Sequence, residues 1–140
     1  MSKKGCGIIF FNAKRRAVLL FRRDNKDSIP FPNMLDLLGG HVEEGEDPAQ
    51  TAVREMAEEL LDLRTGRPYK LQGHNLFLVY TDKRGCEQHI FTCPVDFDTS
   101  NVQLLEGQEL VWLTELQLAS GVPIAFDFGD ILKKFFSSLG

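Results

Sequence analysis

Blocks of apolar residues separated by polar segments run through the first forty positions of the chain. Residues 7–11 and 17–22 are apolar runs joined by a short, mostly polar linker, a pattern typical of a β-hairpin. Residues 23–33 are polar and include two prolines, so they predict a loop. A short apolar strand is predicted at 35–38, and it leads into a double glycine at 39–40.

The second half of the chain shows a similar alternation of strands and turns. Residues 71–81 hold a long apolar run that predicts a strand, and 82–85 have the composition of a hairpin turn. Residues 87–95 alternate weakly between apolar and polar positions, which indicates the returning strand. Residues 102–113 read as a polar turn followed by another strand.

Two helical segments are predicted near the carboxyl end. Thr114 is a good N-cap for a helical turn over 114–118. Residues 127–139 carry apolar side chains at helical spacing, namely Phe128, Ile131, Leu132, Phe135, Phe136 and Leu139. With a second main helix after the double glycine, the mixed elements predict one α/β domain over 1–140, an α/β/α sandwich with a mixed sheet.

The strongest predicted helix follows the double glycine. Asp47 is a good N-cap, and Pro48 fits the first helical position, where no amide hydrogen is needed. Helical geometry places one set of apolar side chains on a common face that can pack on a sheet. That set is Ala52, Val53, Met56, Leu60 and Leu63.

An acidic stripe lies beside that apolar face. Glu55, Glu58, Glu59 and Asp62 share one narrow side of the helix. Like charges four residues apart destabilise a helix by roughly 0.2–0.5 kcal/mol per pair, and Arg54 offsets only part of this. A divalent cation such as Mg²⁺ or Mn²⁺ would stabilise the stripe, because it prefers carboxylate oxygens. The alternative is a solvated acidic face, the commoner situation in acidic helices.

Composition and charge exclude several classes of protein. The 140-residue chain has a formal net charge of −4, which argues against a nucleic-acid-binding surface. Its apolar runs are too short for a membrane span, and the run at 8–11 is too short for a signal peptide. The three cysteines are odd in number and lack metal-ligand spacing, which favours free thiols in a reduced, cytoplasmic setting.

The glycine loop and acidic helix together carry a recognisable motif. Gly40, five residues, Glu46, seven residues and then Arg54-Glu55-Met56-Ala57-Glu58-Glu59 resemble the Nudix box, the signature of the Nudix hydrolases and of MutT-like nucleotide pyrophosphohydrolases. One departure lies at the end of the box, where the pattern has a glycine and this chain has Leu61. Because that glycine usually ends the helix, we expect the helix here to run a turn longer.

The resemblance implies roles for the box residues. The Gly39 carbonyl with Glu55, Glu58 and Glu59 would hold Mg²⁺, or Mn²⁺, and Arg54 would hold Glu55 in place. Glu46 would be mainly structural. The general base stays open between Glu55, Glu59 and Glu106, the last of which matches an extra carboxylate in hydrolases of the 8-oxo-dGTP pyrophosphohydrolase type, with Glu109 as its substitute.

Other side chains are candidates for binding the substrate. Arg22 and Arg23 open the loop at 23–33 and could reach phosphate, or they could be exposed edge-strand arginines. His41 lies at the mouth of the glycine loop, where it contacts substrate or is an ordinary loop histidine. Tyr80, His89 and Phe91 could stack a base, although core packing is favoured for Phe91, and also for Trp112.

The resemblance implies a Mg²⁺-dependent hydrolase. It would cleave the pyrophosphate link of a nucleoside diphosphate derivative, such as a nucleoside triphosphate, a modified nucleotide or a nucleotide sugar. Its partner would be a small-molecule nucleotide, with no nucleic acid and no membrane, and a homodimer would be in keeping with relatives. The alternatives are a non-catalytic nucleotide-binding regulatory domain and a prenyl diphosphate isomerase, which needs a cysteine near the site that neither Cys86 nor Cys93 obviously supplies.

Overall fold

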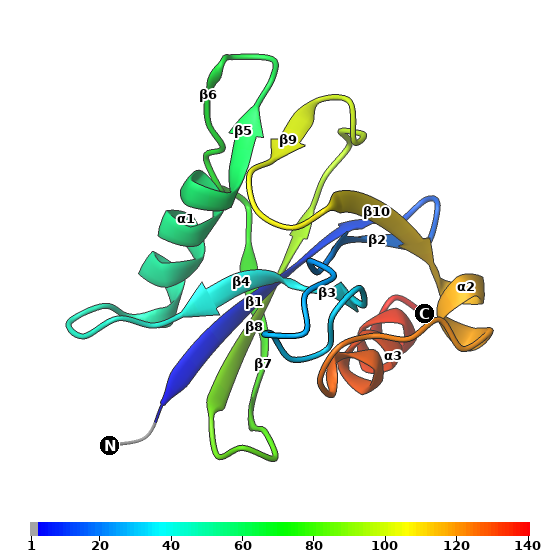
Figure 1. The fold of residues 1–140 in the computed structure, drawn as a ribbon. Helices are drawn as coiled ribbons and strands as arrows, with labels where there is room; N and C mark the ends of the chain where they lie inside the picture. The colour runs from blue at the N-terminus through cyan, green and yellow to red at the C-terminus, as the bar shows by residue number, and fades with distance from the viewer. Residues whose placement is uncertain (1–2) are drawn as a thin grey trace.

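The computed structural model describes residues 3–140, and within them the chain forms ten strands and three helices (Figure 1). The strands are β1 (Lys4–Asn12), β2 (Ala17–Arg22), β3 (Leu35–Asp36), β4 (Leu38–His41), β5 (Leu60–Asp62), β6 (Arg67–Pro68), β7 (Asn75–Thr81), β8 (Glu87–Pro94), β9 (Val102–Leu104) and β10 (Glu109–Thr114). The helices are α1 (Pro48–Glu59), α2 (Glu115–Ala119) and α3 (Phe128–Ser138).

Two sheets organise these strands. The larger has the order β10-β2-β1-β8-β7, and β3 and β4 join it by pairing with β2 and β1. β1 and β8 run parallel, whereas the other pairs in this sheet are antiparallel, so the predicted mixed sheet is confirmed. The smaller sheet, β6-β5-β9, stands beyond the carboxyl end of α1 (Figure 1).

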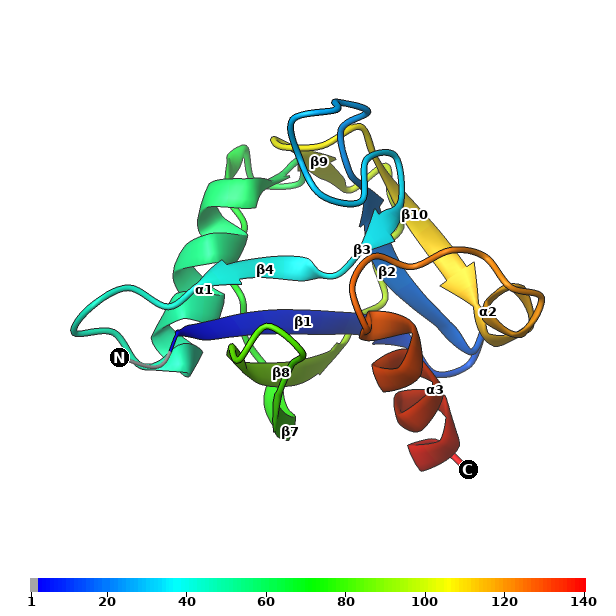
Figure 2. The same cartoon turned by 60° about the horizontal axis from the view of Figure 1, so that its bottom comes forward.

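β1 divides the hydrophobic core in two. Ile8 and Phe10 pack in one cluster with Met56 of α1, whereas Ile9 packs in the other cluster with Leu132 of α3. Alternate residues of a strand point to opposite faces, so β1 is buried on both sides, which explains its continuous apolar run. Figure 2 shows α1 and α3 apart at the two ends of β1. The predicted α/β/α arrangement is confirmed.

The end of α1 differs from the prediction. The helix ends at Glu59, and Leu60 is extended, with φ −125° and ψ 135°. Instead of an extra helical turn, β5 begins at once and pairs with β9 and β6. Strand pairing with β6 and β9 supplies the backbone hydrogen bonds of Leu60–Asp62 in place of helical ones, so the chain leaves the helix here without a glycine. As a result Leu63, which lies beyond the helix, is 49% exposed instead of lying on the packed face of α1. Val53 lies within α1 but is 40% exposed, so it too is outside the packed face.

Other boundaries shift less. β7 begins at Asn75 and not at 71, because Gly73, with φ +79°, interrupts the extended backbone ahead of the strand. Leu71, before that glycine, is buried in the core cluster that contains Met56 of α1. Thr114 caps α2 through its side chain as predicted, and Asp47 caps α1 in the same way. In the described residues, no helix has the length and apolarity needed to cross a bilayer.

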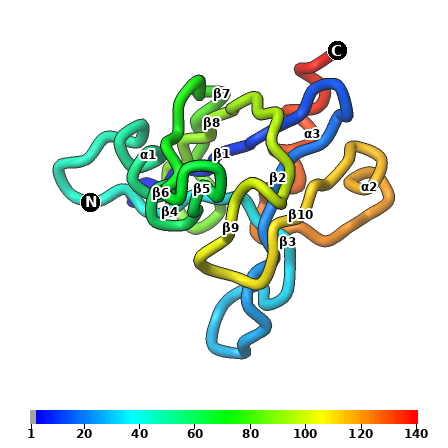
Figure 3. Tube along the Cα trace, turned by 90° about the horizontal axis from the view of Figure 1, so that it is seen from above, coloured from blue at the N-terminus to red at the C-terminus, as the bar shows by residue number. Residues whose placement is uncertain are grey.

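Two connecting segments come together at one end of the sheet. Viewed from above in Figure 3, the loop of residues 23–33 projects on the same side as the segment between β9 and β10. The side chain of Gln108 bonds to Asn33, which joins these two segments directly. This end of the molecule also holds the carboxyl terminus of α1, because the amide of Leu105 donates to the carbonyl of Glu59.

Candidate active site

The junction between the glycine loop and α1 is fixed by Glu46. Arg54 Nε donates to Glu46 Oε2 at 2.8 Å, and Arg54 Nη2 donates to Glu46 Oε1 at 3.0 Å. The hydroxyl of Thr51 donates to the same carboxylate at 2.6 Å. The hydrogen bond from Arg54 and that from Thr51 lower the pKa of Glu46 to about 2. Glu46 is therefore an ionised anchor for the loop, which agrees with the structural role implied for it.

The double glycine permits close approach on two sides. A Cβ added to Gly39 would lie 2.0 Å from the carbonyl oxygen of Cys6, so the loop lies tightly on β1. A Cβ added to Gly40 would lie 2.3 Å from the carboxyl carbon of Glu55. The carboxylate of Glu55 thus occupies the space that any other residue at position 40 would fill.

Glu55 and Glu59 form a close carboxyl pair at the sheet-facing side of α1. Burial raises the pKa of Glu55, against the opposing charge of Arg54. Burial and the charges of Glu55 and Glu106 raise the pKa of Glu59 to about 9. Glu59 Oε2 is a buried oxygen that has no hydrogen-bond partner within residues 3–140. A buried carboxylate oxygen without a partner is costly, so this atom suits a cation.

Arg54 compensates for most of the remaining charge on the stripe. Besides its bonds to Glu46, its Nη1 donates to Glu55 Oε1 at 3.0 Å and to Glu58 Oε2 at 3.2 Å. The Glu58 side chain is 58% exposed and shares the Arg54 Nη1 donor with Glu55. Three or more His, Cys, Asp or Glu side chains arranged to hold a metal ion are not found in the described part of the chain.

Glu106 lies on the segment that follows β9. The amide of Leu105 donates to the carbonyl of Glu59 at 2.8 Å, which brings this segment against the end of α1. Glu106 is exposed and lines an open pocket of about 510 Å³, whose other walls are Phe21, Arg23, Asp24, Ile29, Leu105 and Gly107. Glu109, considered as a substitute for Glu106, instead pairs with Arg22 at 2.9 Å across β10 and β2.

The predicted substrate-binding residues have different surroundings. Arg22 also donates to the carbonyl of Asn33. Arg23 is tied to Asp36 at 2.7 Å, and its guanidinium lies 5.3 Å from the centroid of the Phe126 ring. Both arginines are therefore engaged with protein groups at one wall of the site.

His41 lies on the other side of the box. Its side chain is exposed at the end of β4, and its carbonyl accepts a hydrogen bond from Arg54 Nη2 at 3.2 Å. The histidine lines an open hollow of about 650 Å³ together with Lys3, Lys4, Val42, Glu43, Glu44 and Glu46. Two lysines therefore share the hollow with His41, next to the anchored loop.

Cys6 is a neighbour of the carboxyl pair that the sequence pattern did not indicate. It pairs with Gly40 across β1 and β4, close enough to Glu55 and Glu59 for their charges to act on its thiol. Burial raises the pKa of Cys6 to about 12, so the thiol is protonated at neutral pH. A protonated thiol is a poor nucleophile, which does not favour cysteine-based isomerase chemistry. Only the pairing of strands distant in sequence brings Cys6 here.

The remaining aromatic candidates are not gathered at the carboxyl pair. Phe91 is buried in the core, as favoured, and Trp112 packs partly buried against the same cluster. His89 Nε2 lies 2.7 Å from Glu87, and the Tyr80 hydroxyl donates to Asp127 at 2.9 Å.

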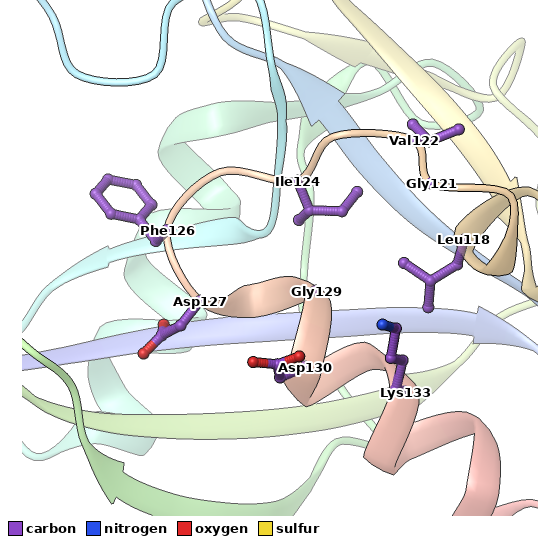
Figure 4. Close-up of a pocket in the computed structure, with 9 residues that line it drawn as sticks. All are labelled: Leu118, Gly121, Val122, Ile124, Phe126, Asp127, Gly129, Asp130 and Lys133. Atoms are coloured by element: carbon purple, nitrogen blue, oxygen red, sulfur yellow. The ribbon is translucent and has the colours of Figure 1, made fainter.

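A separate cavity lies between α2 and α3. Its volume is about 200 Å³, and Figure 4 shows the nine residues that line it, Leu118, Gly121, Val122, Ile124, Phe126, Asp127, Gly129, Asp130 and Lys133. No predicted site residue belongs to this lining. The cavity therefore lies outside the carboxyl cluster.

Comparison with known proteins gives a consistent result. The sequence matches the NUDIX domain over residues 1–131. The chain therefore belongs to the Nudix domain family, as the box predicted. None of the curated proteins matches the sequence.

Solved structures share the fold at low sequence identity. The Nudix domain of NrtR from Shewanella oneidensis, complexed with ADP ribose, has a TM-score of 0.74 and 20% identity, covering 100% of this chain and 90% of that chain. A MutT Nudix hydrolase from Burkholderia pseudomallei has a TM-score of 0.70 and 19% identity, covering 96% and 97%. A MutT protein from Methanosarcina mazei has a TM-score of 0.69 and 23% identity, covering 98% and 94%.

Proposed function

We propose that the protein is a Mg²⁺-dependent hydrolase that cleaves the pyrophosphate link of a nucleoside diphosphate derivative. The observation that carries this proposal is the carboxyl pair of Glu55 and Glu59, with the buried Glu59 Oε2 left without a partner. Two close, buried carboxyl groups repel each other when both are ionised, and a hard cation removes this repulsion. Gly40 leaves the space in which Glu55 lies.

The residues that would hold the cation are Glu55, Glu59, Glu58 and the Gly39 carbonyl. Glu58 needs to leave Arg54 for this role, so it stays a prediction. When bound, Mg²⁺ or Mn²⁺ would neutralise phosphate charge and increase the acidity of a water molecule. Arg54 positions Glu55 through its charge-assisted hydrogen bond and joins that carboxylate to the Glu46 anchor.

A carboxylate must accept the proton of the attacking water. Glu55, Glu59 and Glu106 are the candidates, and all three lie around the carboxyl end of α1. Exposure favours Glu106 as the general base, because it borders the pocket through which water and substrate would enter.

The nucleoside part of the substrate would occupy the pocket beside Glu106. Its volume of about 510 Å³ suits a small molecule, and Phe21 and Ile29 supply apolar walls. Arg22, Arg23 and His41 are retained as candidate substrate contacts. Lys3 and Lys4 line the hollow beside His41 together with Glu43, Glu44 and Glu46, so the charge of this hollow is mixed.

A turnover assay tests this function. The protein is incubated with a panel of nucleoside triphosphates, modified nucleotides, nucleotide sugars and dinucleotides, with Mg²⁺, with Mn²⁺ and with a chelator. Divalent-dependent release of a monophosphate product is expected, and water labelled with ¹⁸O shows which phosphorus is attacked. Absence of turnover across the panel would overturn the proposal.

A second candidate is a nucleotide-binding domain without turnover. The Nudix domain of NrtR has been solved with ADP ribose bound, and it has the same fold as this chain. The two candidates separate when calorimetry finds nucleotide binding while the panel gives no product. We also propose a cytoplasmic location, because the three cysteines are buried and free.

A further inference from the structure

The segment that carries Glu106 is held at both of its ends. At one end, the amide of Leu105 donates to the carbonyl of Glu59 at 2.8 Å. At the other, the amide of Gln108 donates to the carbonyl of Arg22 at 2.9 Å. Gly107, between them, has φ +85°, and a Cβ there would lie 2.8 Å from the Phe21 ring. The segment is thus pressed onto β2 directly beside α1.

The side chain of Gln108 adds a third attachment. Its Nε2 donates to the carbonyl of Arg23 at 2.7 Å and to Asn33 Oδ1 at 2.8 Å. Asn33 closes the loop of residues 23–33, and its amide donates to the carbonyl of Asp24. One amide group therefore connects the two walls of the pocket beside Glu106, which Figure 3 shows projecting together.

We propose that Gln108 is a positioning residue, whose side-chain amide holds Glu106 at a fixed place beside Glu59 by tying its segment to the loop of residues 23–33. The inference rests on the proposed function, because it assigns a role within that site. Gln108 does not touch the carboxyl pair and acts only through Glu106.

The chemistry of the attachment makes the inference testable. Arg23 contributes a backbone carbonyl, which can only accept, so position 108 must supply a donor. Gln108→Glu keeps the size of the side chain but replaces the donor by a charged acceptor. If Gln108 only filled space, this change would be harmless. If the donor positions the segment, Gln108→Glu should be at least as damaging as Gln108→Ala.

Kinetic measurements then distinguish a positioning role of Gln108 from a general effect of the substitution on protein stability. Gln108→Ala removes two exposed side-chain hydrogen bonds, and we expect kcat to fall about 3- to 10-fold while KM changes by less than about twofold. If Glu106 is the general base, Glu106→Gln should lower kcat by about 10²-fold. In the E106Q background, Gln108→Ala should cause no further fall. A full additional fall there would overturn the inference, because independent effects add.

Hydrogen exchange provides a readout that does not depend on turnover. The amide of Leu105 should exchange faster in Gln108→Glu than in the wild type, because the segment loosens. Gln103→Glu is the matched control, since Gln103 is exposed on the adjoining strand β9. Unchanged exchange in Gln108→Glu would overturn the inference. A wild-type protein without turnover would overturn the proposed function, and the exchange result would still decide the role of Gln108.

Discussion

Arg54 donates two parallel hydrogen bonds to Glu46, at 2.8 and 3.0 Å, and its third nitrogen donates to Glu55. One side chain thus joins the anchor of the glycine loop to a residue of the carboxyl pair. Because a guanidinium is planar and presents several donors at fixed angles, no other side chain can make these bonds together.

The variant Arg54→Lys should therefore distinguish the effect of the positive charge of Arg54 from the effect of its hydrogen-bonding geometry. Lysine keeps the positive charge but lacks the fork, so Glu55 loses its fixed orientation, and we expect turnover to fall by about tenfold or more. The melting temperature should also fall. Arg64→Lys is the matched control, because Arg64 makes only a long, exposed contact with Asp62 at 3.6 Å. Equal turnover in the two variants would contradict the role of Arg54.

Glu59→Gln should remove nearly all divalent-dependent hydrolysis, a loss above about 10⁴-fold, which exceeds the roughly 10²–10⁴-fold typical of one general base. The fold should survive, because glutamine has the size of glutamate, and burial and the charges of Glu55 and Glu106 already oppose the ionisation of Glu59 by raising its pKa. Turnover, thermal melting and calorimetry with Mg²⁺ are measured on the same preparation. Asp96→Asn, at an exposed position between β8 and β9, is the control. Near-normal turnover in Glu59→Gln would refute the assignment.

Substitution by alanine should have opposite effects at two glycines, lowering turnover at Gly40 and raising stability at Gly129. Gly40→Ala places a methyl group 2.3 Å from the Glu55 carboxyl, so turnover should fall by about 10-fold or more through displacement of that group. Gly129→Ala in α3 meets nothing closer than 3.7 Å, so it should stabilise the protein by about 0.5–1 kcal/mol, as alanine does in a helix. Thermal melting and the nucleotide assay check both. A Gly40→Ala variant with full turnover would show that Glu55 is free to move.

Asp82 predicts a pH dependence of stability. Burial opposes its ionisation, but hydrogen bonds from the Cys86 amide, Gln88 and Arg84 outweigh this and lower its pKa to about 2, below the ordinary 3.8. A lowered folded pKa contributes stability above about pH 4 that is lost as the pH falls towards 2. Denaturant unfolding between pH 2 and 7 should show this loss in the wild type.

The variant Asp82→Asn isolates that contribution. Its amide would face donors from Gln88 and Arg84, so we expect it to be less stable at pH 7 by about 1–3 kcal/mol. The difference between variant and wild type should shrink as the pH falls below 4. A constant difference across that range would mean that Asp82 does not carry the acid-sensitive stability.

Local sequence signals predicted the parts of the fold that depend on local physics. The caps at Asp47 and Thr114, the first hairpin and α3 follow from neighbouring residues, and the box located the junction that Glu46 and Arg54 hold together. The predicted end of α1 was wrong, because pairing with β9, a strand far along the chain, decides the conformation of Leu60 and Leu61.

The arrangement of the site depends on distant contacts. Cys6 reaches the carboxyl pair through pairing of β1 with β4, and Gln108 reaches Asn33 across the pocket. No local pattern marks either residue. The exposure of Glu58 and its contact with Arg54 likewise follow from side-chain choices that helical periodicity does not specify. Spacing therefore identified which carboxylates are near α1, and the structure determined which of them face each other.

The central place of β1 has a consequence for biosynthesis. β1 is made first, yet its parallel partner β8 is made much later in the chain. During translation its apolar residues stay uncovered on that side until Glu87–Pro94 has left the ribosome, and exposed apolar strands attract chaperones and aggregate. Slow synthesis at low temperature, or supply of a holdase, should therefore raise the soluble yield.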